Sequence, residues 1–280
     1  MEIFGVRVTF KLLALGELLG DLWGRKSMAD FSRMKLGKLP HRHDVRTLKL
    51  SKYMAQLPEI PDFRNWGTAT DDWKMMLNDE LGCCTISGAG HMMMEGKLWN
   101  NQAFELSDSE VKQAYSDVSG YDGSSSTDNG AVMLDVLNYW RNKGIAGHKI
   151  LAFVSINPQN TRLVRAAIEL FGAVYAGVDL PSDAQRQQIW SVAGDGKSGN
   201  HAPGSWGGHC IPLVGFDTAA FNCITWGMPQ WMTEAWWKTY GTEAWVVITQ
   251  EWVDANSGIA PSQMNLSQLL SDLSEIEKED

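Results

Sequence analysis

The spacing of apolar residues changes near the middle of the chain. In the first half, apolar positions recur three or four residues apart, as on one face of an α-helix. The second half carries short runs of valine, isoleucine and aromatic residues, which are typical of β-strands. Helices followed by strands predict an α+β fold with two subdomains. The predicted helices cover 85–100, 107–118, 131–143 and 160–171, and the predicted strands cover 172–179, 209–216, 221–226 and 244–249.

The two ends of the chain have patterns of their own. Leucines at helical spacing predict an amphipathic helix over 8–23, docked on the body of the protein or on a sister chain, or else lying on a membrane surface. Residues 35–53 are basic without clear periodicity and predict an extended arm, and Pro58 and Pro61 mark a boundary between this arm and the body. The acidic residues 271–280 predict a solvated tail.

Composition and charge narrow the choice of protein class. Among 280 residues, 44% are hydrophobic and 20% charged, which excludes a mostly disordered chain. The 24 basic and 33 acidic residues give a net charge of −9, which disfavours a general nucleic-acid binder. The charge is uneven, because residues 1–53 hold eleven basic and five acidic side chains, a net of +6, and the remainder carries −15. Attraction between these parts predicts an N-terminal segment that lies against the body.

The sequence predicts no signal peptide, no membrane span and no metal site. The apolar N-terminal stretch is interrupted by charges and offers no convincing signal-peptide cleavage site. No window reaches 18 uncharged apolar residues, so no membrane span is predicted. Four cysteines are too few for a disulfide scaffold at this size, and they predict reduced thiols in a cytoplasmic setting. Two of them are adjacent and would chelate one ion poorly, so we expect no metal and no other cofactor.

Cys84 and His209 are candidates for catalysis. Cys84 stands just before a predicted helix, where the helix macrodipole lowers the pKa of a thiol and favours the thiolate. His209 follows Gly207 and Gly208 and opens an apolar strand. Glycines at those positions would let another element approach the imidazole closely. A cysteine and a distant histidine are weak support on their own, since structural residues of both types are common.

Short segments, in the same order along the chain, resemble the papain-like cysteine peptidases. Cys84 and His209 are 125 positions apart, close to the roughly 130–150 expected in that family. Asn-Asp, Gly-Gly-His and Thr-Trp-Gly segments are also similar to papain-like proteins from bacteriophage and prophage genomes. The matching segments are Ile60-Pro61-Asp62 with Trp66, Asn78 to Cys84, Leu106-Ser107 with Glu110, Asp128-Asn129-Gly130, Ala167-Ile168 with Gly172-Ala173-Val174, Gly208-His209-Cys210-Ile211 with Val214-Gly215-Phe216, and Thr225-Trp226-Gly227.

The resemblance implies a domain organisation. A papain-like fold has a helical subdomain and a β-barrel-like subdomain, with the active site between them. Here these would span 60–150, with the nucleophile, and 151–255, with the histidine. Residues 1–59 would then be a pro-region-like extension that lies on the catalytic body, and 256–280 an acidic tail.

The resemblance also implies roles for individual residues. Cys84 would attack a carbonyl carbon, with His209 as its ion-pair partner and then as acid to the leaving amine. Asn78 lies six residues before Cys84, where the family has its oxyanion glutamine, whereas Leu77 lies six before Cys83. Cys84 is therefore the candidate nucleophile and Cys83 an inert neighbour. Asn129 and Gly130 would present backbone groups to a substrate, and Trp226 would shield the catalytic pair from water.

Three departures from the family pattern bear on activity. Asn78 is shorter than glutamine, and Thr85 replaces a tryptophan. Ile224 occupies the place of the asparagine that orients the imidazole. Thr225 is the candidate to bond the ring instead, or the orienting group comes from elsewhere.

Three functions stay open from the sequence. The first is a cysteine peptidase acting on a peptide or protein through a thioester acyl-enzyme. The second is a phage- or particle-associated structural protein on a papain-like scaffold with little or no hydrolysis. The third is a thiol acyltransferase or amidase. The expected partners are a peptide substrate, the chain's own N-terminal segment and virion or particle proteins, and the expected location is cytoplasmic or virion-associated.

Overall fold

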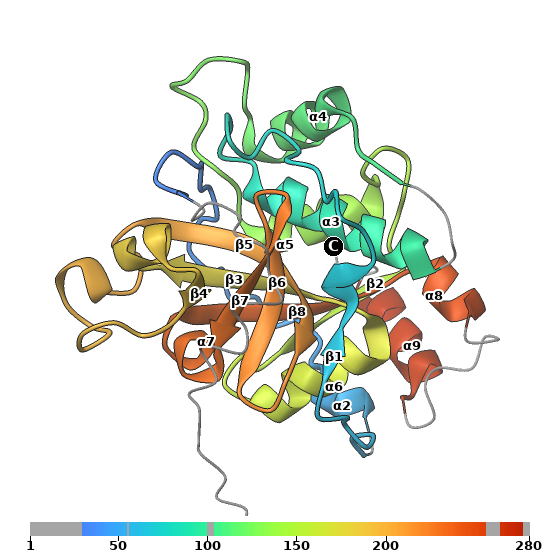
Figure 1. Cartoon of the computed structure of the whole chain (residues 1–280). Coiled ribbons are helices and arrows are strands. Elements are labelled where there is room, and N and C mark those ends of the chain that lie inside the picture. Colours follow the sequence, from blue (N-terminus) through green and yellow to red (C-terminus); the bar gives the residue numbers. More distant parts are fainter. Residues whose placement is uncertain (1–29, 55, 100–103, 256–263, 277–280) are drawn as a thin grey trace, which may run out of the picture.

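A computed structural model describes residues 30–54, 56–99, 104–255 and 264–276 (Figure 1). The predicted helix over 8–23 lies outside these residues. The predicted helices of the body are present, and the second begins as expected. The Ser107 hydroxyl accepts a hydrogen bond from the Glu110 N–H at 3.3 Å, and the Glu110 carboxylate accepts one from the Ser107 N–H at 2.8 Å. The helices are α2 (Leu50–Tyr53), α3 (Cys84–Trp99), α4 (Asp108–Ser119), α5 (Met133–Asn142), α6 (Thr161–Phe171), α7 (Glu234–Tyr240), α8 (Gln250–Ala255) and α9 (Leu266–Ile276).

One eight-stranded sheet forms the centre of the described structure. Its strands follow the order β2-β8-β3-β5-β6-β7-β4, with β1 paired to β5 off this path. The pairs are antiparallel except that of β4 with β7. The strands are β1 (Arg64–Asn65), β2 (Ala152–Ile156), β3 (Val174–Leu180), β4 (Ile189–Trp190), β5 (Gly207–Phe216), β6 (Ala220–Thr225), β7 (Met228–Thr233) and β8 (Gly241–Ile248).

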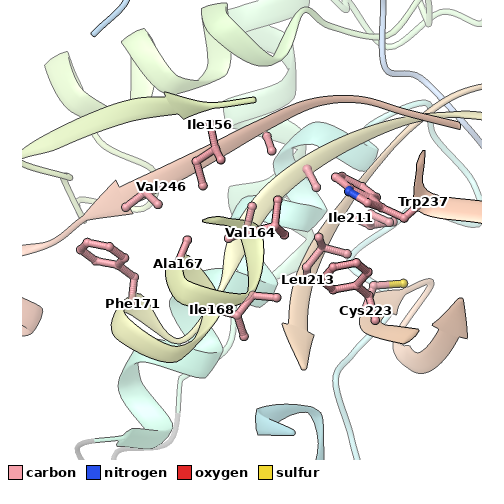
Figure 2. Close-up of a cluster of buried hydrophobic side chains, with 14 of the residues drawn as sticks. Ile156, Val164, Ala167, Ile168, Phe171, Ile211, Leu213, Cys223, Trp237 and Val246 are labelled. Carbon is pink, nitrogen blue, oxygen red and sulfur yellow. The ribbon is translucent and has the colours of Figure 1, made fainter. Parts of the chain in front are cut away.

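The sheet has an apolar core on each face. Along β3, Val174, Ala176 and Val178 belong to one core and Tyr175 belongs to the other, because successive side chains of a strand point to opposite faces. Helices α3, α4 and α5 cover one face and α6 covers the other (Figure 1). Figure 2 shows the apolar side of α6 packed against side chains of β5 and β8. The α+β fold predicted from the sequence is therefore confirmed.

Residues 30–54 lie against this body. Phe31 is 1% exposed and its ring centroid is 4.8 Å from that of Trp226. Further along, Lys52 Nζ is 2.6 Å from Asp272 Oδ2, and Leu269 is fully buried. Residues 271–276 continue α9, and Ser271, Ser274 and Glu275 are exposed there, as expected for a solvated segment.

Candidate active site

Cys84 is the first residue of α3. Its side chain is 1% exposed, and the backbone N–H groups of Cys210 and Lys38 face the sulfur. Cys210 directly follows His209 on β5, so the fold brings the cysteine and the histidine strand together. Cys83 lies in the same buried cluster as Cys84, but its Sγ is 3.4 Å from Ser87 Oγ on α3.

His209 is held by its neighbours on β6. Its Nε2 is 2.8 Å from Thr225 Oγ1, and its ring stacks on that of Trp226 with centroids 4.3 Å apart and an interplanar angle of 16°. All three side chains are buried. The other ring nitrogen, Nδ1, has no hydrogen-bond partner among the described residues. Thr225 thus fixes the imidazole through Nε2.

Asn78 follows a turn with unusual backbone angles. Lys74, Met76 and Leu77 have φ values of 62°, 53° and 60°, in the left-handed region that costs energy for residues other than glycine. Side chains of α3 hold this turn: His91 Nε2 is 2.9 Å from Lys74 O, and the Ser87 hydroxyl donates to Met76 O at 2.9 Å. His91 is therefore structural here, and it fixes the backbone that presents Asn78.

The loop before α5 is fastened to the start of α3. Asp128 Oδ1 accepts hydrogen bonds from the Gly82 N–H at 2.9 Å and from the Tyr115 hydroxyl at 2.7 Å. The Tyr115 oxygen in turn accepts from the Gly130 N–H at 2.9 Å. These bonds fix the position of Ala131 relative to Cys84.

Residues 35–39, which we call the strap, run between this loop and β5. The Ala131 N–H donates to Gly37 O at 2.8 Å, and Ala131 O accepts from the Leu39 N–H at 3.0 Å, so the strap pairs with Ala131 as a parallel bridge. On the other side, Gly208 O accepts from the Lys38 N–H at 3.1 Å. The strap therefore occupies the backbone groups on both sides of the candidate site.

The strap also contacts the residues expected to act on a substrate. Lys35 O accepts hydrogen bonds from Asn78 Nδ2 at 3.3 Å and from Trp226 Nε1 at 3.0 Å. Glycines make this close approach possible, since a Cβ at Gly130 would collide with Gly37 O, and one at Gly208 would collide with Lys38 O. The glycine before the histidine thus has the role that the sequence suggested, and the element that approaches is the strap.

Burial shifts the pKa values of Cys84 and His209 in opposite directions. Burial raises the pKa of Cys84 to about 12, although the nearby Lys38 charge and backbone N–H groups lower it. Burial likewise lowers the pKa of His209 to about 3. Both groups are therefore neutral near pH 7 in this covered form. The predicted thiolate is not present here, because loss of water outweighs the helix macrodipole.

The structure separates the predicted site residues into three groups. Four of them contact the strap: Cys84, Asn78, Gly130 and Trp226. His209 and Thr225 pair with each other beside Trp226. Asn129 is exposed and its Nδ2 donates to Ser126 O at 3.1 Å. The backbone pairing beside it is made by Ala131. Sequence reasoning did not single out Ala131, Lys38 or Glu243. The basic character of residues 35–53 was the available signal for Lys38, and no local pattern distinguished Ala131 or Glu243.

A cysteine at the start of a helix that packs on a strand carrying a histidine, joined to a sheet of this topology, defines a papain-like fold. Xylellain, a cysteine protease from Xylella fastidiosa, has this fold with a TM-score of 0.60 at 13% identity, over 78% of this chain and 97% of that chain. Procathepsin L 3 of Tenebrio molitor gives 0.52 at 12% identity, over 79% and 77%.

The cysteine protease and lectin-like domains of Cwp84, a surface layer associated protein of Clostridium difficile, give a TM-score of 0.54 at 13% identity, over 78% of this chain and 56% of that one. No family model matches the sequence, and no curated protein matches it. The likeness is thus one of fold.

Two further observations concern the described ranges alone. They contain no cluster of three or more histidine, cysteine or acidic residues placed to hold a metal ion. They also contain no helix with the length and apolar character needed to cross a membrane.

Proposed function

We propose that this protein is a cysteine-type peptidase whose N-terminal segment covers its active site. One observation carries the proposal: Cys84 begins α3 beside the backbone of Cys210, and the residue before Cys210 is His209, whose ring is held by Thr225 and stacked on Trp226. The fold shared with xylellain and the other cysteine proteases supports it. The site can carry out acyl transfer with its own residues.

The reaction begins once the strap leaves and water enters. Nδ1 of His209 takes the proton of Cys84, and the sulfur bonds to the carbonyl carbon of the substrate. The Cys84 N–H and the Asn78 amide stabilise the oxyanion, each donor worth about 10²–10³ in rate. The carbon–nitrogen bond breaks and the imidazolium gives its proton to the leaving amine. His209 then takes a proton from water as the water oxygen attacks the thioester carbon. The carbon–sulfur bond breaks, the carboxylic acid product leaves, and the proton on His209 returns to the sulfur.

The covering segment gives residues 1–59 a regulatory role in this proposal. The strap fills the path that a substrate backbone would follow, and it makes hydrogen bonds to Ala131, Gly208 and Asn78. A structural relative is a procathepsin, which supports a pro-region-like extension. Displacement or cleavage of this segment would activate the enzyme.

A structural protein on this scaffold is the second candidate. It is favoured by the complete burial and neutral state of Cys84 and His209, because a permanently covered pair has no access to substrate. The similarity to bacteriophage-type papain-like proteins, and with it a virion or particle partner, belongs to this candidate. A thiol acyltransferase or amidase would use the same pair, and it differs from a peptidase only in the group that accepts the acyl chain.

An epoxide probe for papain-like enzymes tests the proposal. We expect mass spectrometry of the intact chain to find one adduct after the N-terminal segment is displaced or processed, and we expect Cys84→Ala to abolish it. The matched control is Cys83→Ala, which removes the adjacent buried thiol and keeps the adduct. Labelling that survives Cys84→Ala would refute the proposed nucleophile. No labelling together with an intact N-terminus under all conditions would favour the structural protein, and acyl transfer to added amines in place of hydrolysis would favour the transferase.

A further inference from the structure

The side chain of Lys38 is buried in an acidic site. It is 1% exposed, and its Nζ lies 3.4 Å from Asp179 Oδ1 and 3.5 Å from Glu243 Oε1. The ammonium also donates to Leu39 O at 3.3 Å. A charged group is buried at high cost unless it is paired. The strap therefore reaches into a position that accepts a cation.

Glu243 takes its ion-pair partners from the N-terminal segment. Its side chain is 2% exposed, and Oε2 accepts a hydrogen bond from Trp245 Nε1 at 3.0 Å. Its ion pairs within the described part of the chain are with Lys38 and, at 3.9 Å, with His41. Both partners come from the N-terminal segment, so withdrawal of the segment leaves the Glu243 carboxylate beside Asp179 with no other ion-pair partner among the described residues.

The shape of the site suits a long, unbranched side chain. A Cβ at Gly177 would lie 2.8 Å from Lys38 Cδ, 2.7 Å from Glu243 Cγ and 2.9 Å from Met133 Sδ. The glycine on β3 thus leaves just enough room for the methylene stem, and the carboxylates lie at its end. A branched side chain at this place would contact these walls before its end reached the charges.

The backbone beside this site is the one that a substrate would meet. Ala131 and Gly208 hold the strap on either side of Lys38, and the Lys38 N–H faces the Cys84 sulfur. We propose that Asp179 and Glu243 form the specificity site of the enzyme for a lysine or arginine of the substrate close to the cleaved bond, and that Lys38 fills this site in the covered form. This inference rests on the proposed peptidase function and adds the substrate class to it.

The first test measures access to Cys84 in the full-length chain. We expect Lys38→Met to raise the rate of Cys84 alkylation by iodoacetamide at least about tenfold, because loss of one partner of a buried charge pair weakens binding by at least that factor. Lys38→Arg should stay near the original rate, since it keeps the charge. Arg42→Met is the matched control, because it breaks an exposed ion pair of the same segment with Asp135 and should have no effect. An unchanged rate in Lys38→Met would overturn the inference.

The second test adds blocked tetrapeptides to Lys38→Met and measures how well they protect Cys84 from alkylation. Each peptide carries lysine, arginine, norleucine or glutamate at one scanned position. We expect lysine or arginine at one position to protect at a concentration at least about tenfold lower than norleucine does, and Glu243→Gln in the same background to reduce that ratio towards one. Equal protection by lysine and norleucine, or a ratio unchanged by Glu243→Gln, would overturn the inference.

Protection does not require turnover, so the two proposals fail separately. Lysine-selective protection without cleavage of the same peptides would refute the peptidase function and leave the basic specificity of the site standing. Cleavage without selectivity for lysine or arginine would refute the basic specificity of the site and leave the peptidase function standing.

Discussion

Thr225 is the hydrogen-bond partner of His209 Nε2, and its replacement by valine tests whether this bond holds the imidazole. Valine has nearly the shape of threonine but no hydroxyl, so Thr225→Val removes the partner of His209 Nε2 and leaves the stacking on Trp226 in place. Because Nδ1 already lacks a hydrogen bond among the described residues, the variant leaves both nitrogens of a buried ring unpaired. The perturbation is confined to a single bond of 2.8 Å.

The expected cost follows from burial. His209 is fully buried and Thr225 is 2% exposed, so water cannot replace the lost partner without opening the structure. An unsatisfied buried polar group costs about 1–3 kcal/mol. At about 2 kcal/mol, Tm would fall by roughly 4–8 °C in a chain of this size.

Urea denaturation measures this cost in four proteins: the original chain, Thr225→Val, His209→Phe and the variant that carries both changes. In a His209→Phe background the bond is absent, so we expect Thr225→Val to be close to neutral there, and the difference between backgrounds gives the coupling energy. Thr85→Val is the matched control: Thr85 is fully buried and its Oγ1 has no hydrogen-bond partner among the described residues, so the change should be neutral or stabilising. The assignment is refuted if Thr225→Val costs as much in His209→Phe as in the original chain.

Two other predictions concern the strap and the turn behind Asn78. In Gly37→Ala, the new Cβ would collide with the carbonyl of Gly82, so we expect the strap to move out and Cys84 to be alkylated at least about tenfold faster; an unchanged rate would contradict the close packing. Burial lowers the pKa of His91 from 6.5 to about 4, so the unfolded chain binds more protons and stability is lost as pH falls from 6.5 towards 4. His91→Gln should reduce the dependence of the unfolding free energy on pH in that window by up to about 1.4 kcal/mol per pH unit, as measured by urea denaturation at several pH values. The dependence that remains is assigned to His209. An unchanged dependence would show that His91 is not buried as a neutral ring.

Local patterns predicted many of the elements and missed others for identifiable reasons. α4 and α6 carry their own signals, a capping box and a strongly amphipathic face ended by a glycine. By contrast, β7 contains Pro229 and Gln230 and pairs at the far side of the sheet. Its strand structure comes from the ladder with β6, which local propensity does not contain.

The acidic end shows what charge alone leaves open. The charges of residues 271–280 predicted solvation but not the helix α9, which begins before them and buries Leu269 near α2. The limits of the predicted subdomains stay predictions, as do the catalytic roles of the site residues.

The sequence by itself determined the candidate chemistry of this protein. The order of short segments predicted the papain-like fold, the counting of positions distinguished Cys84 from Cys83, and the uneven charge predicted an N-terminal segment on the body. Each of these inferences could be made from the sequence because it depends on residue type and on spacing along the chain.

Only the tertiary structure decided what state the site is in and what surrounds it. Cys84 and His209 are both buried, which raises the pKa of the thiol and lowers that of the imidazole although the local sequence favours a thiolate. The meeting of Lys38 with Asp179 and Glu243 joins three segments far apart in the chain. Solvation and the pairing of charges depend on distances in space, and those distances are set by the packing of the strap on the sheet.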